Sequence, residues 1–104
     1  MRVERWLGQA VRRVVARAKP DKAILFGSRA RRKAKPGSDV DLLVIMKRPL
    51  GRRRRYALVD KALGEHLWPL DLLVRAPDEV AARLKIGDSF FIDIMKNGKV
   101  LYES

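Results

Sequence analysis

Three short apolar segments, residues 23–26, 40–46 and 70–74, constrain the fold most, because each is bounded by turn residues and is too short for a buried helix. They are typical of buried strands, and a last short strand is expected after Gly98. Helices are expected between them, at Leu7–Ala18, Ser28–Ala34, Tyr56–Leu67 after the break at Pro49–Gly51, from Pro77, and from Asp88. This alternation predicts an α/β fold with a small sheet flanked by helices.

The length of the chain indicates one domain, residues 1–104, with enough hydrophobic residues (47%) for a modest core. No segment approaches the roughly 18 consecutive apolar residues of a membrane span. The first residues alternate arginine with apolar side chains and do not resemble a signal peptide. A cytoplasmic protein without a membrane partner is therefore expected.

Side-chain chemistry is restricted, because the chain has no cysteine and a single histidine, His66. Disulfides, cysteine-bound zinc and thiol catalysis are excluded, and carboxylates and hydroxyls remain. The net charge of +12 favours polyanionic partners such as nucleotides, RNA or an acidic protein. With one Asn, one Gln and 35% charged residues, the composition is typical of proteins from hot environments.

Asp39 and Asp41 stand at the head of the second apolar segment. Side chains alternate along a strand, so both carboxylates are expected on one face, with Cα atoms about 6.6 Å apart. Two such anions repel each other unless cations intervene, and a pair of divalent ions about 3.5–4 Å apart would relieve the repulsion and hold a phosphoryl group. Oxygen ligands favour Mg²⁺, and two ions are expected.

Two further features fit a phosphate site. Asp71 is an unexpected carboxylate inside the third apolar segment, on the side opposite Leu70 and Leu72, and would supply a third ligand. Gly27-Ser28 joins a strand to a predicted helix start, where free N–H groups and a hydroxyl can bind phosphate. The adjacent Arg29 and Arg31 are candidate phosphate ligands, which completes the predicted site.

These residues resemble a known signature. Gly27-Ser28, ten intervening residues and then Asp39-Val40-Asp41 resemble the DNA polymerase β-like nucleotidyltransferases, and "GSRAR…SDVDLLV" in so short a chain is similar to the minimal nucleotidyltransferases. The resemblance implies the nucleotidyltransferase fold with a mixed sheet. A glycine often follows "SRAR" in relatives, whereas this chain has Arg32.

The resemblance also implies functional roles. Gly27 and Ser28 would bind the triphosphate, and Asp39, Asp41 and Asp71 would hold the metals, with ATP as the expected NTP. Family members pair with a HEPN-domain protein, often as antitoxin with toxin, and some transfer AMP to that partner. The acceptor hydroxyl is expected on a partner protein or on RNA such as tRNA, and the chain is a candidate to form an oligomer.

Other interpretations stay open. A non-catalytic basic module would neutralise a partner or bind RNA through Arg52–Arg55 and the first helix. A small-molecule nucleotidyltransferase of the aminoglycoside-modifying kind would need an acceptor pocket, for which the chain is short. Apolar surface for a protein contact is expected on the terminal helices, at Leu7–Ala18 and Phe90–Met95.

Overall fold

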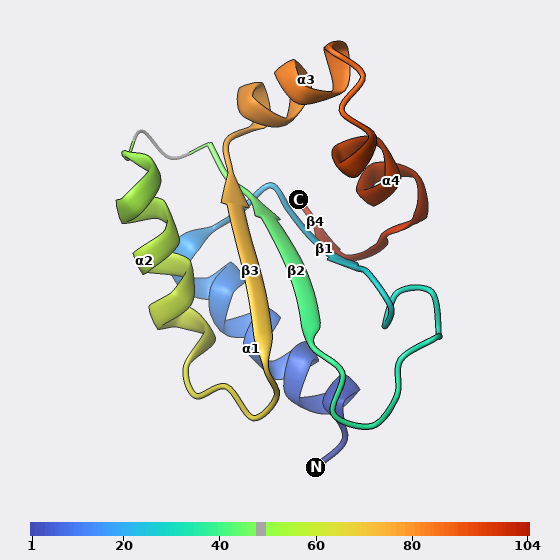
Figure 1. The fold of residues 1–104 in the computed structure, drawn as a ribbon. Coiled ribbons are helices and arrows are strands. Elements are labelled where there is room, and N and C mark those ends of the chain that lie inside the picture. The colour runs from blue at the N-terminus through green and yellow to red at the C-terminus, as the bar shows by residue number, and fades with distance from the viewer. Residues whose placement is uncertain (48–49) are drawn as a thin grey trace.

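The computed structural model describes residues 1–47 and 50–104, and it alternates helices with short strands as the sequence predicts (Figure 1). Its elements in chain order are α1 (Val3–Ala18), β1 (Lys22–Phe26), β2 (Val40–Ile45), α2 (Arg52–Leu63), β3 (Leu70–Arg75), α3 (Pro77–Lys85), α4 (Ser89–Asn97) and β4 (Lys99–Glu103). The predicted break at Pro49 lies outside the described residues.

The strands form one mixed sheet in the order β3-β2-β1-β4. β1 pairs antiparallel with β2 and with β4, whereas β2 and β3 are parallel and are connected through α2. A parallel pair needs a crossover of about a dozen residues, which the twelve-residue helix α2 supplies. The predicted mixed sheet flanked by helices is therefore confirmed.

Each face of the sheet has its own apolar cluster. Leu42 and Val44 of β2 pack with α1 and α2, while Leu43 and Ile45 pack with Val80 of α3 and residues of α4. Figure 1 shows α1 behind the sheet, with α3 and α4 toward the ends of the strands at the top and right. The lower ends of β2 and β3, where both strands begin, therefore lie away from α3.

Three local predictions need correction. Residues 28–34 form no α-helix, only turns as far as Arg32, because they offer only alanine for an apolar face and Arg32 leaves the helical conformation. α2 ends at Leu63, because Arg13 of α1 donates hydrogen bonds to the carbonyls of Ala62 and Leu63 and so satisfies the helix end.

The third correction concerns the exposed apolar surface. Most of the apolar side of α1 is buried against the sheet, with Leu7 and Val14 5% and 1% exposed. The apolar surface that α1 does offer lies in a pocket of about 590 Å³ that it lines with Leu101 and Tyr102 of β4. On α4, by contrast, Phe90 and Ile92 are 48% and 41% exposed, as predicted. No helix within the described ranges is long and apolar enough to cross a membrane.

Candidate functional site

The sheet brings the three predicted carboxylates to one end of one face. Asp39 directly precedes β2, Asp41 is the second residue of β2, and Asp71 is the second residue of β3. In the parallel register Asp41 lies directly opposite Asp71. Alternation places both on the same face as Leu43, the face that α3 and α4 cover only in part.

The electrostatics of this cluster are those of uncompensated anions. Burial raises the pKa of Asp41, and the charges of Asp71 and then Asp39 raise it further. None of the ion pairs formed within residues 1–47 and 50–104 involves any of the three aspartates. In a chain of net charge +12, this is a local excess of negative charge that a bound cation would neutralise.

The three carboxylates fit a metal that shares its ligands with a substrate. No group of three or more acidic or histidine side chains in the described part of the chain lies close enough together to hold a metal ion by itself. Mg²⁺ keeps several waters and is usually held by one or two carboxylates together with substrate phosphates, so it does not require such a preformed cage. Asp41 and its register partner Asp71 suit that mode of binding.

Gly27 packs directly against the cluster. Its φ is +73°, in the left-handed region, and a Cβ at this position would collide with Oδ2 of Asp41 and lie 3.1 Å from its Cγ. Only glycine satisfies both conditions without strain. The turn after β1 therefore packs closely against the carboxylate of Asp41.

The chain makes one helical turn after Gly27. Arg31 N donates to Gly27 O, and the turn closes with hydrogen bonds from Lys33 N to Ser28 O and from Arg32 N to Arg29 O. Those last two bonds form a Schellman motif, in which Arg32 (φ +57°) takes the left-handed position that glycine usually occupies. This is the position, directly after "SRAR", at which the sequence resemblance leads us to expect glycine.

The two predicted arginines have protein partners. Arg29 donates from Nε and Nη2 to the carbonyl of Ser38, at 3.1 and 2.7 Å, and so fixes the chain just before Asp39. Arg31 pairs with Asp93 of α4. Both lie next to the Gly27-Ser28 turn in sequence, and their role as phosphate ligands stays a prediction.

Sequence reasoning missed Arg75, which lies on the same face of β3 as Asp71. The alternation Asp71, Leu73, Arg75 carries the signal, because two charged residues four positions apart in an apolar strand share one face. Burial, followed by the charge of Arg52, lowers the pKa of Arg75.

Comparisons with known proteins agree with this fold. No curated protein matches the chain in sequence. A solved structure from Sulfolobus solfataricus, described as a "putative nucleotidyltransferase", shares the fold with a TM-score of 0.66 and 18% identity, over 95% of this chain and 78% of that one. The family model for the nucleotidyltransferase domain matches residues 7–101. A match over almost the whole length identifies the chain as a member of the nucleotidyltransferase domain family.

Proposed function

We propose that this protein is a Mg²⁺-dependent nucleotidyltransferase that transfers a nucleoside monophosphate, with ATP as donor, to a hydroxyl of a partner protein or RNA. Family membership supports the transfer of a nucleotidyl group from an NTP. The observation that carries the rest is the register of β2 and β3, which sets Asp41 opposite Asp71 beside Gly27.

Each residue of the site would have its own role in metal binding, proton transfer or triphosphate binding. Asp39 and Asp41 would hold both ions, and Asp71 would hold one of them and accept the proton of the attacking hydroxyl. When bound, Mg²⁺ supplies positive charge that offsets the charge developing on the α-phosphate. The turn at Gly27 and Ser28 positions the triphosphate, because N–H groups at the start of a helical turn have no internal acceptor.

The sequence resemblance and the surface of α4 indicate the NTP donor and the protein partner that we propose. ATP and a HEPN-domain toxin are proposed from the resemblance of the "GSRAR…SDVDLLV" segment to the minimal nucleotidyltransferases. Phe90, Ile92 and Met95, all at least 36% exposed on α4, offer apolar surface to a protein partner. An antitoxin role follows if that partner is the toxin.

Calorimetric titration of ATP with and without Mg²⁺ tests the site. We expect ATP binding that requires Mg²⁺, and loss of AMP transfer from labelled ATP in Asp39→Asn and Asp41→Asn. Asp60→Asn is the matched control, since it makes the same change on α2, where Asp60 pairs with His66. Equal ATP binding with and without the metal, or full activity of Asp41→Asn, would contradict the proposal and favour a basic binding module.

A further inference from the structure

A cationic pocket, separate from the acidic cluster, lies on the face of the sheet that carries the aspartates, toward the other end of β3. It is a pocket of about 450 Å³ between β3 and the helices α2, α3 and α4. Its lining residues are Arg52, Arg75, Glu79, Ala82, Arg83, Asp88 and Phe91. Three guanidinium groups therefore converge on one cavity.

Both acidic residues that line this pocket already form ion pairs. Glu79 pairs with both Arg52 and Arg55, at 3.4 and 2.7 Å, and also accepts a hydrogen bond from the backbone N–H of Ala76. Asp88 pairs with Arg83 at 2.6 Å and accepts from the first N–H groups of α4.

Arg75 is left without a carboxylate among the described residues. Its only protein acceptor there is the carbonyl of Val74, at 2.9 Å. The lining of the pocket holds three guanidinium groups and two carboxylates, and Glu79 also pairs with nearby Arg55, so positive charge exceeds negative charge here. Burial and the nearby charge of Arg52 outweigh the opposing effect of Glu79 and lower the pKa of Arg75, so the charged guanidinium carries a free-energy cost. An anion in the pocket would relieve that cost.

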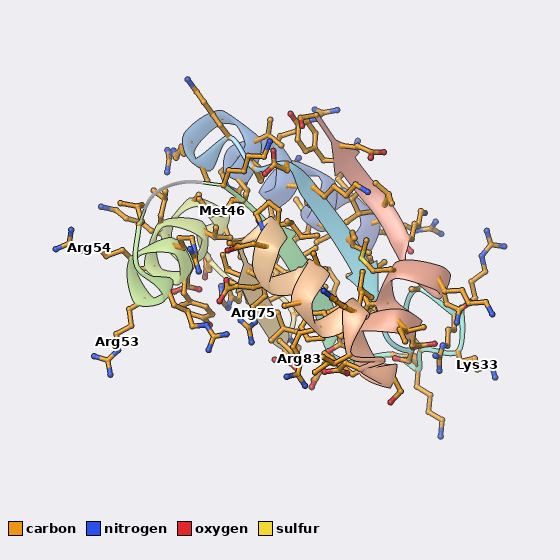
Figure 2. The ribbon with its side chains drawn as sticks, turned by 90° about the horizontal axis from the view of Figure 1, so that it is seen from above. Lys33, Met46, Arg53, Arg54, Arg75 and Arg83 are labelled. Carbon is orange, nitrogen blue, oxygen red and sulfur yellow. The ribbon has the colours of Figure 1, made fainter. Side chains whose placement is uncertain are left out.

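The pocket is connected to the candidate active site through the strand itself. Asp71 and Arg75 share one face of β3, and four residues of strand separate their Cα atoms by about 13 Å. On its other side the cationic surface continues onto α2, where Figure 2 shows Arg53 and Arg54 extending away from the molecule. A short flexible strand of phosphates could follow these arginines from α2 to the aspartates.

The chemistry of this surface favours nucleic acid over protein. The centre of a protein interface is usually apolar and aromatic, yet none of the large exposed hydrophobic residues in the described chain lines this pocket. Arginine forks match phosphate oxygens in a bidentate manner. Interfaces with nucleic acid are polar and strongly positive, and arginines supply three of the seven residues that line this pocket.

We propose that the pocket lined by Arg52, Arg75 and Arg83 binds the phosphate backbone of a single-stranded RNA that presents its terminal hydroxyl to the aspartates. The inference rests on the proposed function for the identity of the reaction, and it names RNA as the acceptor. RNA binding at Arg75 is a separate property, measurable without ATP, Mg²⁺ or turnover.

The test uses a fluorescein-labelled oligouridylate of about twelve nucleotides, titrated with the full chain at several salt concentrations without nucleotide. We expect Arg75→Gln to weaken binding about tenfold or more, because a hydrogen-bonded charge is lost. The slope of log K against log salt should fall by about 0.7, the value for one phosphate contact on a single strand. Arg52→Gln, at a largely exposed side chain, is the second variant and should act in the same direction.

Arg17→Gln is the matched control, because it removes the same charge from exposed Arg17 on α1, behind the opposite face of the sheet. Equal weakening by Arg17→Gln and Arg75→Gln would mean that only net charge matters, and would overturn the proposal. So would unchanged RNA binding in Arg75→Gln and Arg52→Gln, or loss of Mg²⁺-ATP affinity in Arg75→Gln with RNA affinity intact, which would assign the pocket to the donor. Asp41→Asn separates the two hypotheses, since it should abolish transfer and leave RNA bound.

Discussion

Replacing Gly27 with alanine tests the contact that joins the phosphate turn to the carboxylates. Two costs arise in Gly27→Ala. The left-handed φ of +73° costs an alanine about 1–2 kcal/mol, and the colliding Cβ forces the side chain of Asp41 out of its rotamer, for about 0.5–1.5 kcal/mol more. The displaced carboxylate should lower the rate of transfer about a hundredfold.

Gly37→Ala separates the two costs. Gly37 has a φ of +84°, and nothing lies within 4 Å of a Cβ built there, so this variant carries the backbone cost alone. Gly27→Ala should therefore be less stable than Gly37→Ala by about 1 kcal/mol, which lowers Tm by about 4–8 °C in a domain of this size. Thermal and urea unfolding of both variants measure the difference. If the two variants have the same Tm and the same urea midpoint and both retain activity, Asp41 does not pack on Gly27 and the reasoning is wrong.

Two predictions concern Asp41 and Arg32. The folded-state pKa of Asp41 is raised above its ordinary 3.8, which means that the ionised Asp41 destabilises the folded state. This destabilisation is complete at neutral pH and disappears as the carboxylate is protonated, when pH falls through the raised pKa. Asp41→Asn should thus be more stable than wild type at pH 7, with a gain that shrinks toward pH 4; a constant gain in urea unfolding would refute this. Arg32→Gly should remove about 1–2 kcal/mol of left-handed strain at the expense of about 0.4–1 kcal/mol of chain entropy, so Tm should rise by a few degrees, and a lower Tm would contradict the Schellman assignment.

The elements that sequence predicted well are those with a strong apolar pattern. β2 and β3 were expected within one residue of their observed ends, because Val40–Ile45 and Leu70–Arg75 are nearly continuous apolar segments. Strand alternation predicted a shared face for Asp39 and Asp41, and Asp71 was expected as a third ligand from another strand. The direct pairing of Asp41 with Asp71 could not be predicted, because it depends on a parallel register that only the crossover through α2 determines.

Features set by distant contacts escaped prediction. The end of α2 at Leu63 depends on Arg13, which is fifty residues away in the chain. The turn after Gly27 was expected to continue as a helix, because no local rule assigns Arg32 to a conformation that usually needs glycine. Both errors arise where a side chain or an uncommon backbone angle overrides local preference.

Two hydrogen bonds from Arg29 to the carbonyl of Ser38 hold together the two ends of the loop between Gly27-Ser28 and Asp39. These two residues begin and end the ten-residue interval between Ser28 and Asp39, so the ends of the interval are tied together independently of its middle. Doubling a loop closed in this way costs only about 0.6 kcal/mol. Residues 35–37 at its tip are exposed, so a peptide tag inserted between Pro36 and Gly37 should leave the turn and the aspartates in place.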